Sequence, residues 1–374
     1  MSDWESVLPR TAKAAWAGIE AGRHTGVQIH VSLAGRTLAD AAVGEARPGV
    51  PLTPDSLVLW LSATKPFGAV AILQLVERGL IALDDRVEKF VPEFGQNGKE
   101  AVTIRHCLIH TGGFRWAGTA AMERTWETAI AAVCRAKQER DWVPGEKAGY
   151  HPYSSWYMLG EIVRRVTGRP FADYVRSEIF VPLDMLDAWV GVPLDEQYRY
   201  GERIAILTDR SGREIKPHVW AASPEAIAFG PPGAGGYGPI RELTHLYEAL
   251  LNEGVRNGRR ILSAESVRAM IGRQREGMSD ETFRDVVDWG FGLLLDSKRY
   301  GNPNVPYGYG PFASDATFGH SGNQSSIAFA DPAHQLIAAI HCNGMPGDAA
   351  HQERMDGLTS ALYEDLGLES SKPA

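Results

Sequence analysis

The residues of this sequence with the clearest chemical potential are Ser62 and Lys65, which begin a long apolar stretch. On a helix, side chains three positions apart lie on one face, so the amine of Lys65 can reach the hydroxyl of Ser62. The N–H groups and the positive dipole of a first helical turn favour negative charge at Ser62. A lysine held against a buried helix loses its proton more easily and can serve as the base for a serine nucleophile. A Ser-x-x-Lys pattern also arises by chance, but a lysine at the start of an apolar helix favours the catalytic interpretation.

Two other patterns with chemical meaning are weaker. His106 and His110 are four positions apart, a spacing that can hold zinc on one helix face. The glutamate of the zinc-protease pattern is absent and no third ligand stands out, so a packed helix end is the preferred interpretation. Residues 233–238 fit G-x-G-x-x-G, but Pro231 and Pro232 precede them where a dinucleotide-binding fold needs a strand. A loop that lines a cleft fits this glycine-rich segment better.

The composition is that of a folded, acidic chain. Its 374 residues carry 38 basic and 46 acidic side chains, a formal net charge of −8, and 44% of them are hydrophobic. This length predicts two or more domains, or one large domain, and the apolar content excludes overall disorder. An acidic chain without a basic stripe lacks the counterion-release term that dominates nucleic-acid affinity, so we expect no nucleic-acid partner. Three widely separated cysteines cannot form a disulfide framework, which favours a reducing compartment.

No secretory or membrane segment is predicted. Residues 1–22 contain charged side chains and no apolar core of a signal peptide. The most apolar stretch, residues 57–76, is interrupted by Ser62, Lys65 and Pro66, which argue against a spanning helix. We therefore expect a soluble, cytoplasmic protein with no membrane partner.

The elements that must position these residues predict an α/β (α+β) fold. Apolar periodicity and turn residues indicate a first helix, a hairpin, several internal helices, late strands and a closing helix. The first helix is expected over residues 4–21 and the hairpin over 26–33 and 37–43. The internal helices are expected over 67–76, 156–166 and 242–251, the late strands over 289–295, 325–330 and 335–342, and the closing helix over 351–366. We expect an antiparallel sheet domain, flanked by helices and built from residues 1–60 and 285–374, and a mostly helical domain of residues 61–284. The active site is expected in the cleft between them.

Three ordered motifs extend the signal around Ser62. They are Leu61-Ser-Ala-Thr-Lys-Pro-Phe67, the stretch from Val102 to Phe114, and Pro144-Gly-Glu146 before a tyrosine. Together they resemble the serine β-lactamase and penicillin-binding-protein fold, and within it the class C β-lactamase-related esterases known as family VIII carboxylesterases. The resemblance covers residues 27–366. It implies catalysis by a serine, a lysine and a tyrosine.

The resemblance assigns the tyrosine to Tyr150. Family members carry Tyr-His before a helix with Gly-Glu and paired arginines, which Tyr150-His151-Pro152 and residues 159–165 match. A phenol between cationic or dipolar neighbours can act as a phenolate or a proton relay. Tyr153 is the alternative, and otherwise it packs the loop against the next helix.

The third family element, Lys-Thr-Gly in the lactamases, is here His320-Ser321-Gly322. The missing lysine argues against β-lactam hydrolysis, and Ser321 lacks the G-x-S-x-G spacing of a rival nucleophile. A neutral His320 is expected to donate a hydrogen bond to Tyr150 or to the substrate, unless it is a solvent-facing turn residue. Gly322 would let the strand approach the substrate.

By the same resemblance, the backbone N–H groups of Ser62 and Asn323 form the oxyanion hole. Aromatic residues in loops can add an apolar pocket for the acyl or alcohol group. The candidates are Trp116, Trp142, Trp220 and Tyr237.

The expected function is that of a serine hydrolase that cleaves carboxylic esters through an acyl-enzyme, with a small-molecule acyl substrate and neither metal nor cofactor. Three alternatives remain open: transfer of the acyl group to an amine or alcohol, hydrolysis of amides, and a non-catalytic scaffold. Intact Ser62, Lys65 and Tyr150 argue against the last. The sequence does not determine the oligomeric state.

Overall fold

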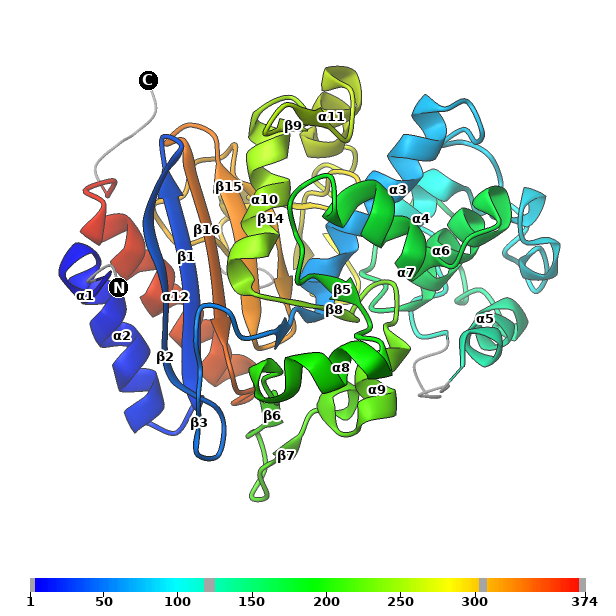
Figure 1. The fold of residues 1–374 in the computed structure, drawn as a ribbon. Helices are drawn as coiled ribbons and strands as arrows, with labels where there is room; N and C mark the ends of the chain where they lie inside the picture. The colour runs from blue at the N-terminus through cyan, green and yellow to red at the C-terminus, as the bar shows by residue number, and fades with distance from the viewer. Residues whose placement is uncertain (1–3, 118–124, 303–307, 370–374) are drawn as a thin grey trace.

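The computed structural model describes residues 4–117, 125–302 and 308–369, and its centre is a seven-stranded antiparallel sheet (Figure 1). Strands from both ends of the chain form it, in the order β13-β14-β15-β16-β1-β2-β3, and the two groups meet where β16 pairs with β1. This confirms the predicted antiparallel sheet. Its strands are β1 Gly26–Leu33, β2 Arg36–Arg47, β3 Val50–Pro51, β13 Leu294–Leu295, β14 Phe318–Gly322, β15 Ser326–Asp331 and β16 Leu336–Cys342.

Strand β1 shows why helices cover both faces of the sheet. Val27, Ile29 and Val31 alternate along it and pack in one apolar cluster with residues of the first and last helices. The side chains between them face the other layer. There Oε1 of Gln28 accepts the backbone N–H of Ile240 at 2.6 Å, at the start of α10 (Ile240–Leu251). The polar residues of β1 thus fix the helix that covers the second face.

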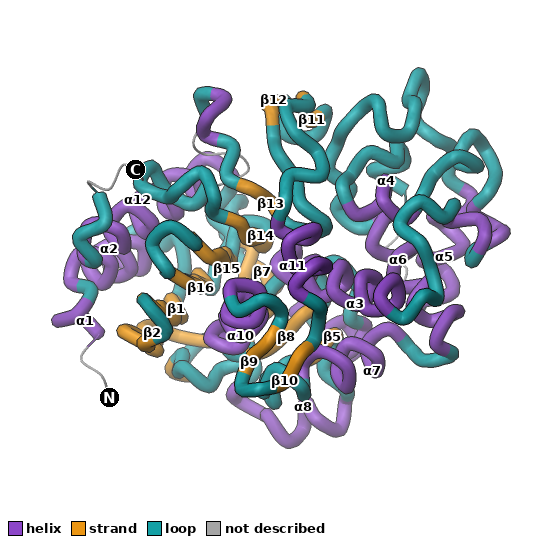
Figure 2. The backbone as a smooth tube through the Cα atoms, turned by 90° about the horizontal axis from the view of Figure 1, so that it is seen from above, coloured by secondary structure: helices purple, strands orange, loops and turns teal. Residues whose placement is uncertain are grey.

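The terminal helices lie side by side on the first face (Figures 1 and 2). They are α2 (Pro9–Glu20) and α12 (Asp348–Asp365), with α1 (Trp4–Val7) before them. The prediction of one helix over residues 4–21 was wrong, because the chain breaks at Leu8. Pro9, which lacks an N–H donor, begins the second helix, where no intrahelical bond is required.

The helical part is built around α3 (Lys65–Glu77), which is buried almost all round as its sequence predicts (Figure 2). Ser62 lies just before it, in a single turn of 3-10 helix, Leu61–Thr64, rather than in the α-helix. The other helices of this region are α4 Ile104–Leu108, α5 Trp126–Arg135, α6 Ser154–Thr167, α7 Phe171–Val175, α8 Leu194–Tyr200, α9 Pro224–Phe229 and α11 Ala264–Ile271.

Residues 289–295 were expected to form a strand, but only Leu294–Leu295 does so, paired with β14. Gly292 has a φ of 66°, a turn conformation that ends any extended run here.

The predicted division into residues 1–60 with 285–374 and residues 61–284 stays a prediction. Short strands elsewhere form small sheets: β4 Val58–Leu59, β8 Gly236–Gly238 and β5 Trp189–Val190 together, β6 Thr208–Asp209 with β7 Lys216–Pro217, β9 Val255–Arg256 with β10 Arg259–Arg260, and β11 Ser279–Asp280 with β12 Asp285–Val286.

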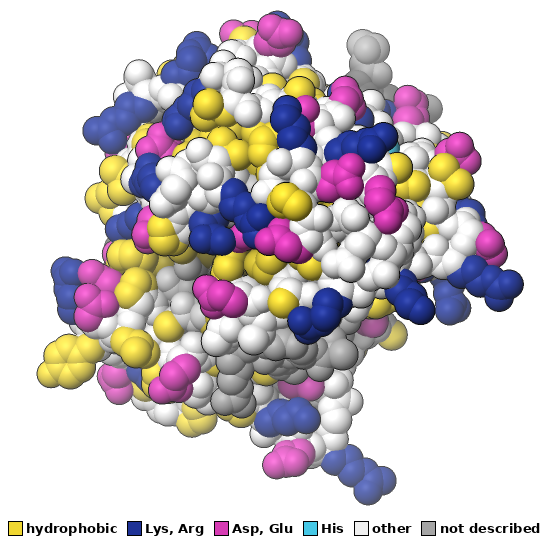
Figure 3. Space-filling view, turned by 90° about the vertical axis from the view of Figure 1, so that its right-hand side faces the viewer, with side chains coloured by type: hydrophobic (Ala, Val, Ile, Leu, Met, Phe, Trp, Pro, Cys, Tyr) yellow, Lys and Arg dark blue, Asp and Glu magenta, His cyan; other side chains and the backbone are white. Residues whose placement is uncertain are grey.

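The outer face of the helical part carries both signs of charge among apolar side chains (Figure 3). Ion pairs such as Arg165 with Glu93 join neighbouring elements there. Within the described ranges, no helix combines the length and apolar character needed to cross a membrane.

The burial of α3 is tested by two leucines. Leu75 is fully buried in α3, whereas Leu80 just beyond the helix is 50% exposed. We expect Leu75→Ala to lower the free energy of unfolding by about 2–5 kcal/mol, since it leaves a cavity in the core. The matched control, Leu80→Ala, should change it by less than about 0.5 kcal/mol. Urea denaturation measures both, and equal losses would contradict this packing.

Candidate active site

Ser62 is presented by a strained turn. The residue before it, Leu61, has a φ of 50°, a left-handed conformation that is unfavourable for a residue with a branched side chain. The Leu61 side chain is buried in an apolar cluster with Leu57 and Leu59, and this packing holds the turn in place. Ser62 itself is half-buried.

The amine of Lys65 is buried among three oxygen atoms. Nζ lies 2.8 Å from Oγ of Ser62, 2.9 Å from the carbonyl oxygen of Pro152 and 2.8 Å from that of Gly233. Burial lowers the pKa of Lys65 well below its ordinary value. A neutral amine has two N–H groups and one lone pair, and the two carbonyls can only accept. The lone pair is therefore left for the Ser62 hydroxyl to donate to.

Tyr150 is the tyrosine that the structure brings to Ser62. Its hydroxyl donates to Oγ of Ser62 at 2.8 Å, and Nζ of Lys65 lies 5.1 Å from its ring centroid. Tyr153 instead precedes α6 and packs its ring edge against Trp220, with the centroids 6.4 Å apart. Burial raises the pKa of Tyr153. The serine oxygen thus lies between an amine and a phenol.

The ring of Tyr150 is enclosed by aromatic side chains from other segments. The ring centroids lie 4.8 Å away for His110, 5.1 Å for Phe283 and 5.7 Å for Trp289, which stacks on it. Such contacts between rings are favourable at these separations. They fix the direction in which the phenol hydroxyl points.

A fully buried ion pair joins the segments around Tyr150. Nη2 of Arg275 donates to Oδ2 of Asp280 at 2.8 Å, and both side chains are 0% exposed. Oδ1 of Asp280 accepts the backbone N–H groups of Tyr150 and Phe283, each at 3.1 Å. The Arg275 guanidinium lies 5.4 Å from the ring centroid of Trp289. One ion pair therefore positions the tyrosine and two of its ring neighbours.

The end of β14 lies directly beside the turn that carries Ser62. A Cβ at Gly322 would collide with the backbone oxygen of Trp60, and Oγ of Ser326 donates to that same oxygen at 2.8 Å. Glycine is thus required for the approach of β14 to the turn that carries Ser62. Asn323 follows at once, so the predicted pair of oxyanion donors, Ser62 and Asn323, belongs to adjoining segments; their role stays a prediction.

His320 is part of β14 and only 3% exposed, so it is not a solvent-facing turn residue. Burial lowers its pKa to about 3, so its ring is neutral. Nδ1 lies 2.8 Å from the carbonyl oxygen of Ser321, which can only accept, so Nδ1 carries the proton. Nε2 is then an acceptor, and it is buried without a protein partner. The expected donation to Tyr150 or to the substrate does not fit this arrangement.

The aromatic residues that were predicted to form an apolar pocket differ in how exposed they are. Tyr237 is 1% exposed within β8, and its hydroxyl donates to the carbonyl oxygen of Trp220 at 2.7 Å. The side chain of Tyr237 is thus packed in the core, and its role in substrate binding stays a prediction. Trp116 is 55% exposed and stays a candidate, whereas Trp142 is buried and bonded to Thr111.

The histidine pair is structural. Nδ1 of His106 accepts the backbone N–H of Thr103, and Oγ1 of Thr103 accepts that of His106, which caps α4. Nδ1 of His110 accepts the backbone N–H of His151. The preferred interpretation, a packed helix end, is confirmed. Among the residues that the structure describes, no three His, Cys, Asp or Glu side chains are grouped to hold a metal ion.

The sequence motifs did not identify the groups that orient Lys65 and Tyr150. Gly233 was assigned to a cleft loop, but its carbonyl binds the Lys65 amine. The signal was the glycine itself, since a Cβ there would lie 2.8 Å from the ring of Trp156. Arg275 and Asp280 carried no signal, because the backbone groups that they contact in the site, at Ile109 and Tyr150, lie more than a hundred positions away in the chain.

Comparison with known proteins identifies the family and supports the fold. The family model described as Beta-lactamase matches residues 10–361, so the chain belongs to the beta-lactamase family, as its resemblance predicted. Esterase/beta-lactamase LipL from Mycobacterium tuberculosis is 29% identical over 357 residues, covering 87% of this chain and 81% of that protein. A penicillin-binding protein homologue from Caulobacter crescentus has a TM-score of 0.78 at 30% identity, over 96% of this chain and 97% of the other. A family VIII carboxylesterase has a TM-score of 0.76 at 25% identity, with the same coverage.

The buried ion pair can be tested by removing one partner. Asp280→Ala leaves the Arg275 charge buried without its counter-ion, so we expect the free energy of unfolding to fall by about 3–5 kcal/mol. The double variant Arg275→Met with Asp280→Ala should recover part of that loss, because no lone charge remains. Urea denaturation measures both; a loss below about 1 kcal/mol for Asp280→Ala would contradict the pairing.

Proposed function

We propose that this protein is a serine esterase that hydrolyses carboxylic esters through an acyl-enzyme. The observation that carries the proposal is the position of Oγ of Ser62, 2.8 Å from both Nζ of Lys65 and the hydroxyl of Tyr150. A nucleophile in contact with its base, and a base oriented by further groups, is the recurring signature of covalent catalysis. Here Pro152 and Gly233 supply that orientation through their carbonyls.

In the proposed reaction, Oγ of Ser62 attacks the ester carbonyl carbon while its proton passes to the neutral amine of Lys65. The N–H groups of Ser62 and Asn323 stabilise the negative oxygen of the tetrahedral intermediate. Lys65 returns the proton through Tyr150 to the leaving alcohol, and the carbon–oxygen bond breaks. Water then attacks the acyl-enzyme along the reverse route and releases the carboxylic acid.

Two observations favour an uncharged ester as substrate. The neutral ring of His320 offers no positive charge to the carboxylate of a β-lactam. The relatives include one named esterase/beta-lactamase and one described as a family VIII carboxylesterase. Product analysis with a competing alcohol distinguishes hydrolysis from acyl transfer, because transfer yields a new ester instead of the acid.

Nucleophile and relay can be tested by substitution. Ser62→Ala should abolish turnover of short-chain p-nitrophenyl esters and labelling by a fluorophosphonate, with an unchanged circular dichroism spectrum. Tyr150→Phe should lower kcat by about 10²–10⁴-fold, since it removes a group that transfers protons. The matched control is Tyr153→Phe, which should keep most of the activity. Equal losses in the two tyrosine variants, or turnover by Ser62→Ala, would refute the assignment.

The pH profile tests the state of Lys65. Only the neutral amine can accept the Ser62 proton, and burial lowers the pKa of Lys65 well below 10.5. We therefore expect kcat/KM to fall as the pH decreases through this lowered pKa, and to reach a plateau well below pH 10.5. Lys65→Arg, which cannot lose its proton, should be inactive throughout. A profile that keeps rising to the pH at which a solvated lysine titrates would contradict a neutral amine.

A further inference from the structure

A cavity lies apart from Ser62, between α8, α9 and the end of β2. Its volume is about 430 Å³, within the range of small-molecule sites, and twelve residues line it. Ser62, Lys65 and Tyr150 are not among them. Two wall residues, Ile204 and Ile227, pack in the same apolar cluster as Leu61, so this cavity and the candidate active site border a common core.

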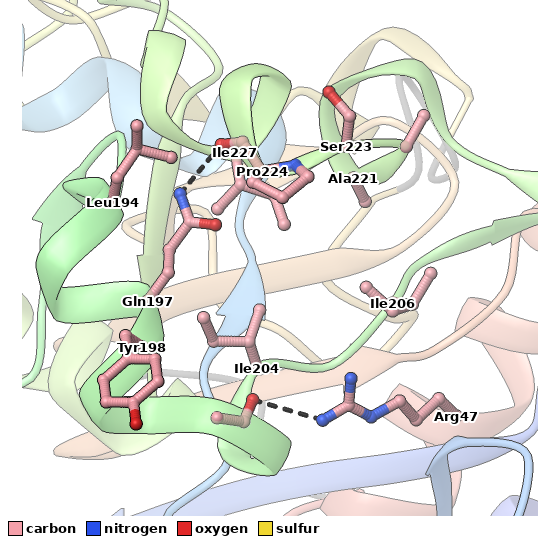
Figure 4. A pocket seen from close by; sticks show the side chains of 12 residues that line it. Arg47, Leu194, Gln197, Tyr198, Ile204, Ile206, Ala221, Ser223, Pro224 and Ile227 are labelled. Atoms are coloured by element: carbon pink, nitrogen blue, oxygen red, sulfur yellow. Dashed lines mark hydrogen bonds between the residues drawn. The ribbon is translucent and has the colours of Figure 1, made fainter.

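The wall of this cavity is mainly aliphatic. Leu194, Ile204, Ile206 and Ile227 surround it in Figure 4. Its rim is exposed: helix α8 buries none of its own residues, and Leu194 is 55% exposed on it. Contiguous apolar surface that is open to solvent is typical of binding sites. The wall can therefore receive the apolar body of a ligand.

Arg47 is the one charged residue among the twelve that line the cavity. Its Nη2 donates to the carbonyl oxygen of Gly201 at 3.1 Å, and its Nε is buried without a hydrogen-bond partner (Figure 4). Among the described residues, no carboxylate lies at ion-pair distance from its guanidinium, and Nη1 has no protein acceptor. A positive charge beside an aliphatic wall is complementary to a ligand with one negative charge and an apolar chain.

We propose that this cavity binds an amphiphilic monocarboxylate, with the carboxylate on Arg47 and the chain against Ile204, Ile206 and Ile227. A single guanidinium neutralises one negative charge, whereas a doubly charged phosphate would keep an uncompensated charge beside an apolar wall. Planar guanidinium groups also match carboxylate geometry. The acid released by the proposed ester hydrolysis has this chemistry, but the binding site does not depend on that reaction.

Isothermal titration with decanoate tests the proposal on the full-length protein. Arg47→Gln should raise the Kd for decanoate at least about tenfold, since it removes a charged hydrogen-bond donor. The matched control is Arg36→Gln, which removes an exposed arginine at the other end of β2 and should leave the Kd unchanged. Decyltrimethylammonium, with the same chain and the opposite charge, should bind the wild-type protein more weakly than decanoate.

Two further variants keep the test decisive if Arg47→Gln unfolds. Arg47→Lys retains the charge and should give a Kd between those of the wild-type protein and Arg47→Gln. Ile206→Asp retains Arg47 but places a negative charge in the wall, and should weaken decanoate binding at least about tenfold. An equal decanoate affinity in wild-type, Arg47→Gln and Ile206→Asp proteins would overturn the proposal. So would equal affinity for the two oppositely charged amphiphiles, or no binding of decanoate to the wild-type protein.

Discussion

The site depends on one physical constraint: the amine of Lys65 is held out of water, and no carboxylate among the described residues is in contact with it. Nζ of Lys65 contacts one hydroxyl and two carbonyl oxygens, all of them neutral. A buried ammonium would lose most of its hydration, so the surroundings favour the neutral amine. A carboxylate at the same distance would hold the proton on the lysine. The neutral state of the Lys65 amine therefore depends both on the neutral oxygen atoms around it and on the absence of a carboxylate among the described residues in contact with it.

This constraint explains the less regular parts of the fold. The carbonyl of Gly233 reaches the amine because a glycine fits against the ring of Trp156, where a Cβ would be too close. The left-handed turn at Leu61 presents Ser62, and buried leucines around it compensate for the strain. Gly322 lets β14 approach the backbone of Trp60. Each irregularity positions Ser62, Lys65 or the strand beside them.

Periodicity in the sequence was sufficient for the central strands and the buried helix, because burial determines their apolar pattern. Strands β1 and β16 and helix α3 lie within a few residues of their predicted ranges, since each is apolar on the faces that it buries. The first helix and residues 289–295 were mispredicted because Pro9 and Gly292 override the apolar pattern locally. In the site, the i, i+3 spacing was enough to pair Ser62 with Lys65. The Arg275–Asp280 pair was not predictable, because it acts on the backbone of distant segments and leaves no spacing in the sequence.

The ionisable groups around Ser62 are either neutral or paired with an opposite charge. Burial lowers the pKa of His151 and of His320 to about 3, and that of His110 well below its ordinary value, so these rings are neutral. The charges of Arg275 and Asp280 compensate each other within the interior. A neutral, weakly solvated site strengthens the effect of each N–H group on a developing oxyanion.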